Sequence, residues 1–110
     1  MLEINNKDQF EKEVLESEKP VLVEFHAHWC GPSKAMESVL ADVDKKYSNE
    51  LMVIKVSVGE GEGEFITYDY RIKAYPTLLL MKEGRTMERI IGLVDFNEIT
   101  GLLKKNNILE

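Results

Sequence analysis

The sequence lacks a second cysteine. Cys30 is the only one among 110 residues, so no disulfide can form within the chain, and its thiol serves either packing or reactivity. The sequence also lacks an apolar run near the ~20 residues of a membrane span. Its N-terminus lacks the basic region and apolar stretch of a signal peptide. With Met1 as the natural start, these absences favour a cytoplasmic protein.

A cluster of basic residues is absent as well. The formal net charge is −6, with 31% charged and 44% apolar residues. Nucleic acids and anionic membranes bind positively charged surfaces, so we expect neither as a partner. The length suits one domain, residues 1–110, that buries its own core. We expect a monomer.

What is present is an alternation of strand and helix patterns. Residues 21–27 are β-branched and almost continuously apolar, as in a central strand buried on both faces. Pro32 fits the first turn of the helix that follows. The periodicity predicts further strands at 2–4, 51–58, 74–81 and 89–91, and further helices at 5–17, 65–70 and after 95. This order predicts an α/β fold with a mixed sheet, because the last two strands are joined by a tight turn and must be antiparallel.

Cys30 stands where a thiol becomes reactive. It follows the central strand and directly precedes Gly31 and Pro32 at the start of a helix. The free N–H groups of a helix start stabilise a thiolate, which is the form that attacks a disulfide. The alternative is a buried structural cysteine.

Three stretches resemble the thioredoxin family: "VLVEFHAHWCGPSK", "YPTLLLMKEGR" and "IIGLV". The resemblance implies a thioredoxin-like central mixed five-strand sheet with helices on both faces, and a thiol–disulfide oxidoreductase that acts on disulfide-containing proteins. It implies that Cys30 is the nucleophile. It also implies a substrate-binding surface with Pro76 in the cis form, made by Trp29, Gly31, Pro32, Tyr75, Pro76 and Gly92. For Gly92, a bulge in an edge strand is the alternative.

Ser33 departs from the family pattern, because it stands where the resolving cysteine is expected. A hydroxyl cannot displace a disulfide-bonded substrate, so the reaction would stop at a mixed disulfide on Cys30. Two origins fit: a natural monothiol protein, which the divergence of other positions favours, or an engineered Cys→Ser change that traps the intermediate. We expect no bound cofactor. Recycling would need an external thiol such as glutathione or, for a dithiol parent, a flavin- and NADPH-dependent thioredoxin reductase. The alternative function is a redox-inactive peptide-binding module on the same scaffold.

Three ionisable residues flank this motif. The resemblance gives Glu24 a role in proton transfer, and a structural role with a hydrogen bond to Lys55 or water is the alternative. A protonated His28 would stabilise the Cys30 thiolate and lower its pKa, unless it is merely a solvated loop residue. The pattern H-x-H-x-C is formed by His26, His28 and Cys30. Zinc needs about four ligands and the chain offers no fourth, so we expect no metal. The acidic stretch 59–64, "GEGEGE", predicts a flexible solvated loop rather than a calcium site.

Overall fold

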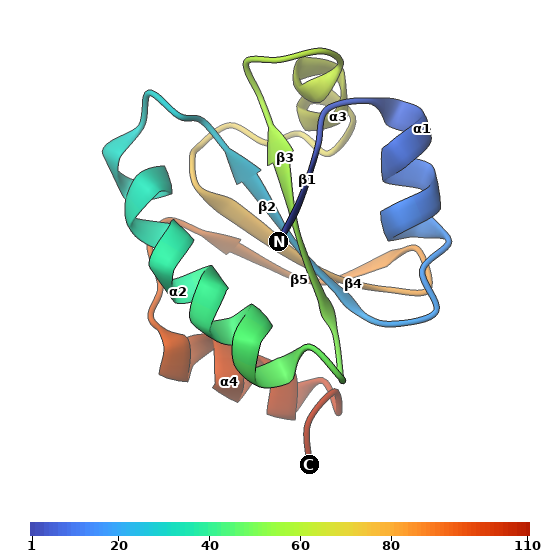
Figure 1. Ribbon diagram of the computed structural model, residues 1–110, viewed down its shortest axis with the longest axis vertical. Coiled ribbons are helices and arrows are strands. Elements are labelled where there is room, and N and C mark those ends of the chain that lie inside the picture. Colours follow the sequence, from blue (N-terminus) through green and yellow to red (C-terminus); the bar gives the residue numbers. More distant parts are fainter.

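Five strands form one mixed sheet, in the order β1-β3-β2-β4-β5, in this computed structural model of residues 1–110 (Figure 1). β3 pairs in parallel with β1 and with β2, whereas β4 is antiparallel to both β2 and β5. The predicted fold class is therefore confirmed. The strands are β1 (Leu2–Ile4), β2 (Val21–His26), β3 (Met52–Ser57), β4 (Thr77–Lys82) and β5 (Arg85–Ile91).

Helices cover both faces of the sheet, with α1 and α3 on one face and α2 and α4 on the other (Figure 1). The Asp95–Glu98 capping box is present at the start of α4. No helix combines the length and the apolar character needed to cross a membrane. The helices are α1 (Lys7–Phe10), continued by the π-helical turn η1 (Glu11–Leu15), then α2 (Gly31–Tyr47), α3 (Gly63–Asp69) and α4 (Phe96–Lys105).

The central strand β2 is buried along its whole length, as its apolar sequence predicts. Side chains of a strand alternate between its faces. Val21, Val23 and Phe25 accordingly pack with α1 and α3. Leu22 packs with α2 and α4, and Glu24 and His26 follow it on that same face. The α2 side of β2 thus changes from apolar to ionisable towards the end that leads to Cys30.

Three details differ from the sequence predictions. The helix expected over 5–17 is a single α-helical turn followed by η1, in which the N–H of Glu16 reaches the carbonyl of Glu11. β5 begins at Arg85 rather than residue 89, because its pairing with β4 continues down to the turn at Gly84. The helical segment is thus shorter than expected and β5 is longer, and neither difference changes the order of the elements.

The acidic stretch 59–64 is the third difference, because it is attached to the segment before α1. The N–H of Glu62 donates to the carbonyl of Asn5 at 2.6 Å, and the N–H of Lys7 donates to the Glu62 carboxylate at 2.9 Å. Gly63 already belongs to α3. Residues 59–62 form an exposed turn, as expected for a solvated loop. The helix start at Gly63 and the contacts with the segment before α1 were not predicted, since local composition does not reveal partners more than fifty residues away.

Gly63 is expected to be intolerant of any side chain. A Cβ there would lie 1.8 Å from the carbonyl oxygen of Ser57, which is backbone and cannot rotate away. Gly63→Ala should therefore lower the free energy of unfolding by at least about 2 kcal/mol, measured by urea denaturation. Gly101→Ala is the matched control, because Gly101 lies exposed in α4 with no atom within 4 Å of its added Cβ. That change should raise stability by about 0.5–1 kcal/mol; equal effects of the two substitutions would contradict this explanation.

Candidate functional site

Cys30 is the N-cap residue of α2, as the sequence predicts. Its backbone is extended, its N–H donates to the carbonyl of Ala27 at 3.0 Å, and its side chain is half-buried and makes no capping bond. Gly31 and Pro32 form the exposed first turn of the helix. The thiol therefore lies at the positive end of a 17-residue helix, where the unpaired N–H groups favour negative charge.

The segment before β4 faces this thiol. The Tyr75–Pro76 peptide bond is cis, as the resemblance implies. The Cys30 thiol donates a hydrogen bond to the carbonyl oxygen of Tyr75, with 3.4 Å between sulfur and oxygen. Residues 30 and 75 are thus brought together although they are far apart in the sequence. In the reduced protein this carbonyl is occupied by the thiol, a contact that sequence reasoning did not predict.

Aromatic side chains next to Cys30 in the sequence pack against one another and against Tyr75. Trp29 is 62% exposed and meets Tyr75 edge to face, with 6.4 Å between ring centroids. His28 packs in the same way against Trp29, at 5.2 Å. Gly59 lies against both side chains, and a Cβ there would approach the Trp29 ring to 3.0 Å. His28 is exposed, and no hydrogen bond connects it to Cys30, so its effect on the thiol stays a prediction.

Gly92 lies beside the cis-proline and just past the end of β5. Its N–H donates to the carbonyl of Pro76 at 2.9 Å, and its φ of +93° is a conformation that favours glycine. The irregularity in β5 lies elsewhere, opposite Leu80 and Met81, so the alternative of a bulge at Gly92 was wrong. Nothing lies within 4 Å of an added Cβ, and the flanking Ile91 and Leu93 are exposed. The structure therefore leaves an open apolar surface next to the thiol.

Ser33 is fully buried beneath Cys30 in the first turn of α2. Its hydroxyl accepts a hydrogen bond from the N–H of Ala27 at 3.5 Å, and none joins it to the Cys30 sulfur. The side chain that replaces the expected resolving thiol is thus directed inwards, towards the end of β2.

Glu24 is completely buried, and neither of its carboxylate oxygens has a hydrogen-bond partner. Burial raises the pKa of this carboxyl to about 7, against the opposing effect of the Lys55 ammonium. The proposed hydrogen bond from Lys55 to Glu24 is absent, because Lys55 bonds to Glu37 of α2 and lies 3.7 Å from Glu3 of β1. The alternative in which Lys55 holds Glu24 was therefore wrong.

His26 is the residue that sequence reasoning misjudged. The H-x-H-x-C pattern groups it with His28 and Cys30, but His26 lies within β2 and is only 6% exposed, whereas His28 follows the strand in an exposed turn. The His26 Nδ1 atom is buried without a hydrogen-bond partner and lies 3.9 Å from Glu24 Oε1. The spacing of two residues along a buried strand was the signal that could have paired these side chains.

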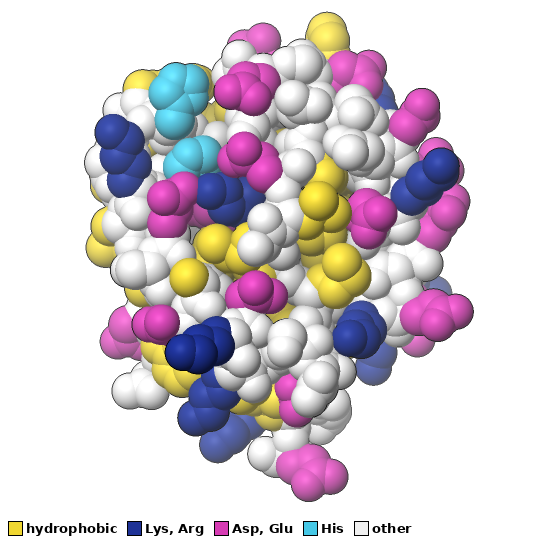
Figure 2. Space-filling view, in the orientation of Figure 1, with side chains coloured by type: hydrophobic (Ala, Val, Ile, Leu, Met, Phe, Trp, Pro, Cys, Tyr) yellow, Lys and Arg dark blue, Asp and Glu magenta, His cyan; other side chains and the backbone are white.

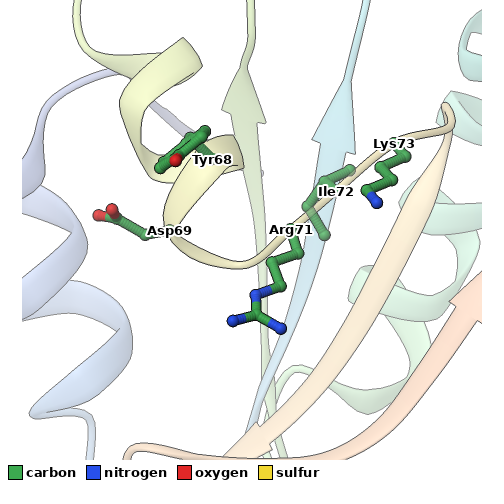
Figure 3. Close-up of a pocket in the computed structure, with 5 residues that line it drawn as sticks. All are labelled: Tyr68, Asp69, Arg71, Ile72 and Lys73. Carbon is green, nitrogen blue, oxygen red and sulfur yellow. The ribbon is translucent and has the colours of Figure 1, made fainter.

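The surface around Cys30 is open rather than enclosed. The largest hollow, of about 610 Å³, lies beside α3 and is lined by residues 68, 69 and 71–73 (Figure 3). Neither it nor the two smaller hollows is lined by Cys30, Trp29 or Pro76. Small-molecule sites are usually concave, so the arrangement at Cys30 suits a macromolecular partner that lies across an open surface.

Comparison with known proteins agrees with this geometry. The thioredoxin family model matches residues 1–105. The chain is 39% identical over 100 residues to the chloroplastic M-type thioredoxin of Spinacia oleracea, which covers 91% of this chain and 54% of the spinach protein. It is 35% identical over 97 residues to thioredoxin 1 of Synechococcus elongatus, covering 88% of this chain and 89% of that protein. A thioredoxin of Rickettsia felis is 36% identical, with 88% and 90% covered.

Proposed function

The chain belongs to the thioredoxin family, and from this premise we propose that it is a thiol–disulfide oxidoreductase that attacks protein disulfides through Cys30 and stops at a mixed disulfide. The observation that carries the proposal is the position of the half-buried thiol, at the N-terminus of α2 and 3.4 Å from the carbonyl of Tyr75. That position supports a thiolate and presents it to an extended partner.

Substrate binding uses the open surface beside the thiol. An extended peptide would lie between Trp29 and Gly92, with its backbone along the segment at Tyr75 and Pro76. The peptide would compete with the Cys30 thiol for the Tyr75 carbonyl, so its arrival frees the sulfur for attack. The exposed Ile91 and Leu93 offer the apolar contact area.

The chemistry proceeds in three exchanges. First, the Cys30 thiolate attacks one sulfur of the substrate disulfide; a bond forms between Cys30 and that sulfur, and the other sulfur leaves as a thiolate and takes a proton. Within the chain nothing can break the new bond, because Ser33 supplies only a hydroxyl. An external thiolate such as glutathione then attacks the substrate sulfur of the mixed disulfide; Cys30 leaves as a thiolate, and glutathione stays bound to the substrate through a new disulfide. A second glutathione thiolate attacks that disulfide and releases the substrate thiol and oxidised glutathione. Two electrons then pass in total from two glutathione molecules to the original disulfide.

The test is adduct formation followed by intact mass. Reduced protein mixed with a disulfide-bonded peptide near neutral pH should gain the mass of one peptide half, mapped to Cys30, and Cys30→Ala should gain none. If no adduct forms while iodoacetamide still alkylates Cys30, the chain is instead a redox-inactive binding module. In that case Cys30→Ala would bind the peptide as well as the unchanged protein does.

A further inference from the structure

The buried side-chain nitrogen and oxygen atoms without a hydrogen-bond partner all lie at one place in this structure. They are both carboxylate oxygens of Glu24 and the Nδ1 atom of His26. Leaving a buried polar group unpaired is costly, and such groups in folded proteins call for an explanation. Their convergence indicates that the two side chains act on one another.

The two side chains are arranged along a line from the interior to the surface. Glu24 is completely buried, whereas His26 lies one step further along the same face of β2. Its inner nitrogen, Nδ1, is 3.9 Å from Glu24 Oε1. Its outer nitrogen, Nε2, is not among the buried unpaired atoms and forms no hydrogen bond within the protein, so it reaches solvent. A shift of about 1 Å closes the inner gap to hydrogen-bond distance.

Charged groups from three elements surround this pair. The charges of Lys55 of β3, Glu37 of α2 and Glu3 of β1 act on both side chains, and that of the exposed His28 acts on His26. Figure 2 shows histidine side chains next to lysine and acidic side chains on the face formed by α2. Lys55 is paired with Glu37 and Glu3, so it is not free to bind the Glu24 carboxylate. From β4, the residue opposite Glu24 is the apolar Leu78.

We propose that His26 is the proton-transfer partner of Glu24: its Nδ1 exchanges a proton with the buried carboxyl, and its Nε2 exchanges one with solvent. When Glu24 releases its proton, Nδ1 accepts it and the proton on Nε2 leaves to water or to a departing thiolate. The two transfers together pass one proton from the carboxyl to the outside, and no bond between heavy atoms changes. The use of this proton in exchange at Cys30 rests on the proposed function, whereas the transfer itself does not.

The neighbouring charges fit such a pair. Burial raises the pKa of Glu24 to about 7, while burial and the charge of Lys55 lower the pKa of His26 from 6.5. The carboxyl therefore keeps its proton up to neutral pH, and the imidazole next to it stays neutral and able to accept one. A neutral acid beside a neutral base avoids burying a charge.

The test is an NMR titration of the protein without substrate, so a failure of thiol exchange leaves its result intact. In the unchanged protein, the Glu24 carboxyl carbon should show an inflection near pH 7, and the His26 ring nitrogens should respond to that same step. In Glu24→Gln, which keeps the shape of the side chain, His26 should lose that inflection.

A second variant removes the histidine and measures the titration of Glu24. His26→Phe retains a ring but removes Nδ1, so the carboxyl loses its only neighbouring acceptor, and the Glu24 inflection should move to higher pH. The proposal is overturned if His26 titrates in the same way with and without the Glu24 carboxyl, or if the Glu24 inflection is unchanged in His26→Phe.

Discussion

Under the proposed function, Ser33→Cys is expected to complete an exchange that the unchanged chain leaves at a mixed disulfide. Residues 30 and 33 lie three positions apart at the start of α2, and residues at this spacing face one another on a helix. The introduced thiol would attack the Cys30 sulfur within the same molecule and release the reduced substrate. In the unchanged chain the mixed disulfide is broken by an external thiol at millimolar concentration, whereas in the variant a thiol of the same molecule attacks it. Release of the substrate should therefore be faster by at least about 100-fold.

The measurement is the reduction of a protein disulfide driven by dithiothreitol. The unchanged chain and Ser33→Ala should be equally slow, because neither supplies a second thiol, whereas Ser33→Cys should turn over many times. Since Ser33 is fully buried and sulfur is only slightly larger than oxygen, the fold should tolerate the change. An unchanged mixed-disulfide lifetime in a folded Ser33→Cys variant would contradict the role assigned to position 33.

Glu24→Gln is expected to remove a large pH dependence of stability. The pKa of Glu24 is about 7 in the folded protein against an ordinary 4.5. Below pH 4.5 both states carry the proton and the carboxyl contributes no difference. Between 4.5 and 7 the unfolded chain ionises while the folded protein does not, so the free energy of unfolding falls as pH rises. The full loss is roughly 3 kcal/mol and is reached above pH 7.

Urea denaturation of both proteins at steps from pH 4 to pH 8 measures this effect. The difference in unfolding free energy between Glu24→Gln and the unchanged protein should grow in favour of the variant by roughly 3 kcal/mol across that range. The m-values should agree, which would show that the unfolded states are equally exposed. Parallel stability curves would mean that Glu24 is not a buried titrating carboxyl.

The sequence was sufficient for the elements that depend on local pattern. The apolar run of β2, Pro32 in the first turn of α2 and the capping box at Asp95 each identify an element without reference to the rest of the chain. Resemblance to a family supplied the cis bond at Pro76, which no local pattern determines.

The parts that sequence reasoning missed depend on contacts between distant residues. Glu62, in the stretch 59–64, donates a backbone hydrogen bond to Asn5. Lys55 forms its hydrogen bond with Glu37 rather than with Glu24. His26 was considered as a metal ligand next to Cys30, whereas the β2 pleat places it on the α2 face beside Glu24. Side-chain partners across a sheet or beneath a helix are set by tertiary packing, which composition and periodicity do not encode.

The most direct test of the central claim is the lifetime of the mixed disulfide on Cys30. The adduct with a disulfide-bonded peptide would be purified, and its decay would be followed by intact mass with and without reduced glutathione. Our account predicts that the adduct persists alone and decays with a rate proportional to the glutathione concentration, returning free Cys30. Decay at the same rate without any added thiol would contradict it, because the chain would then contain a resolving group that we have not identified.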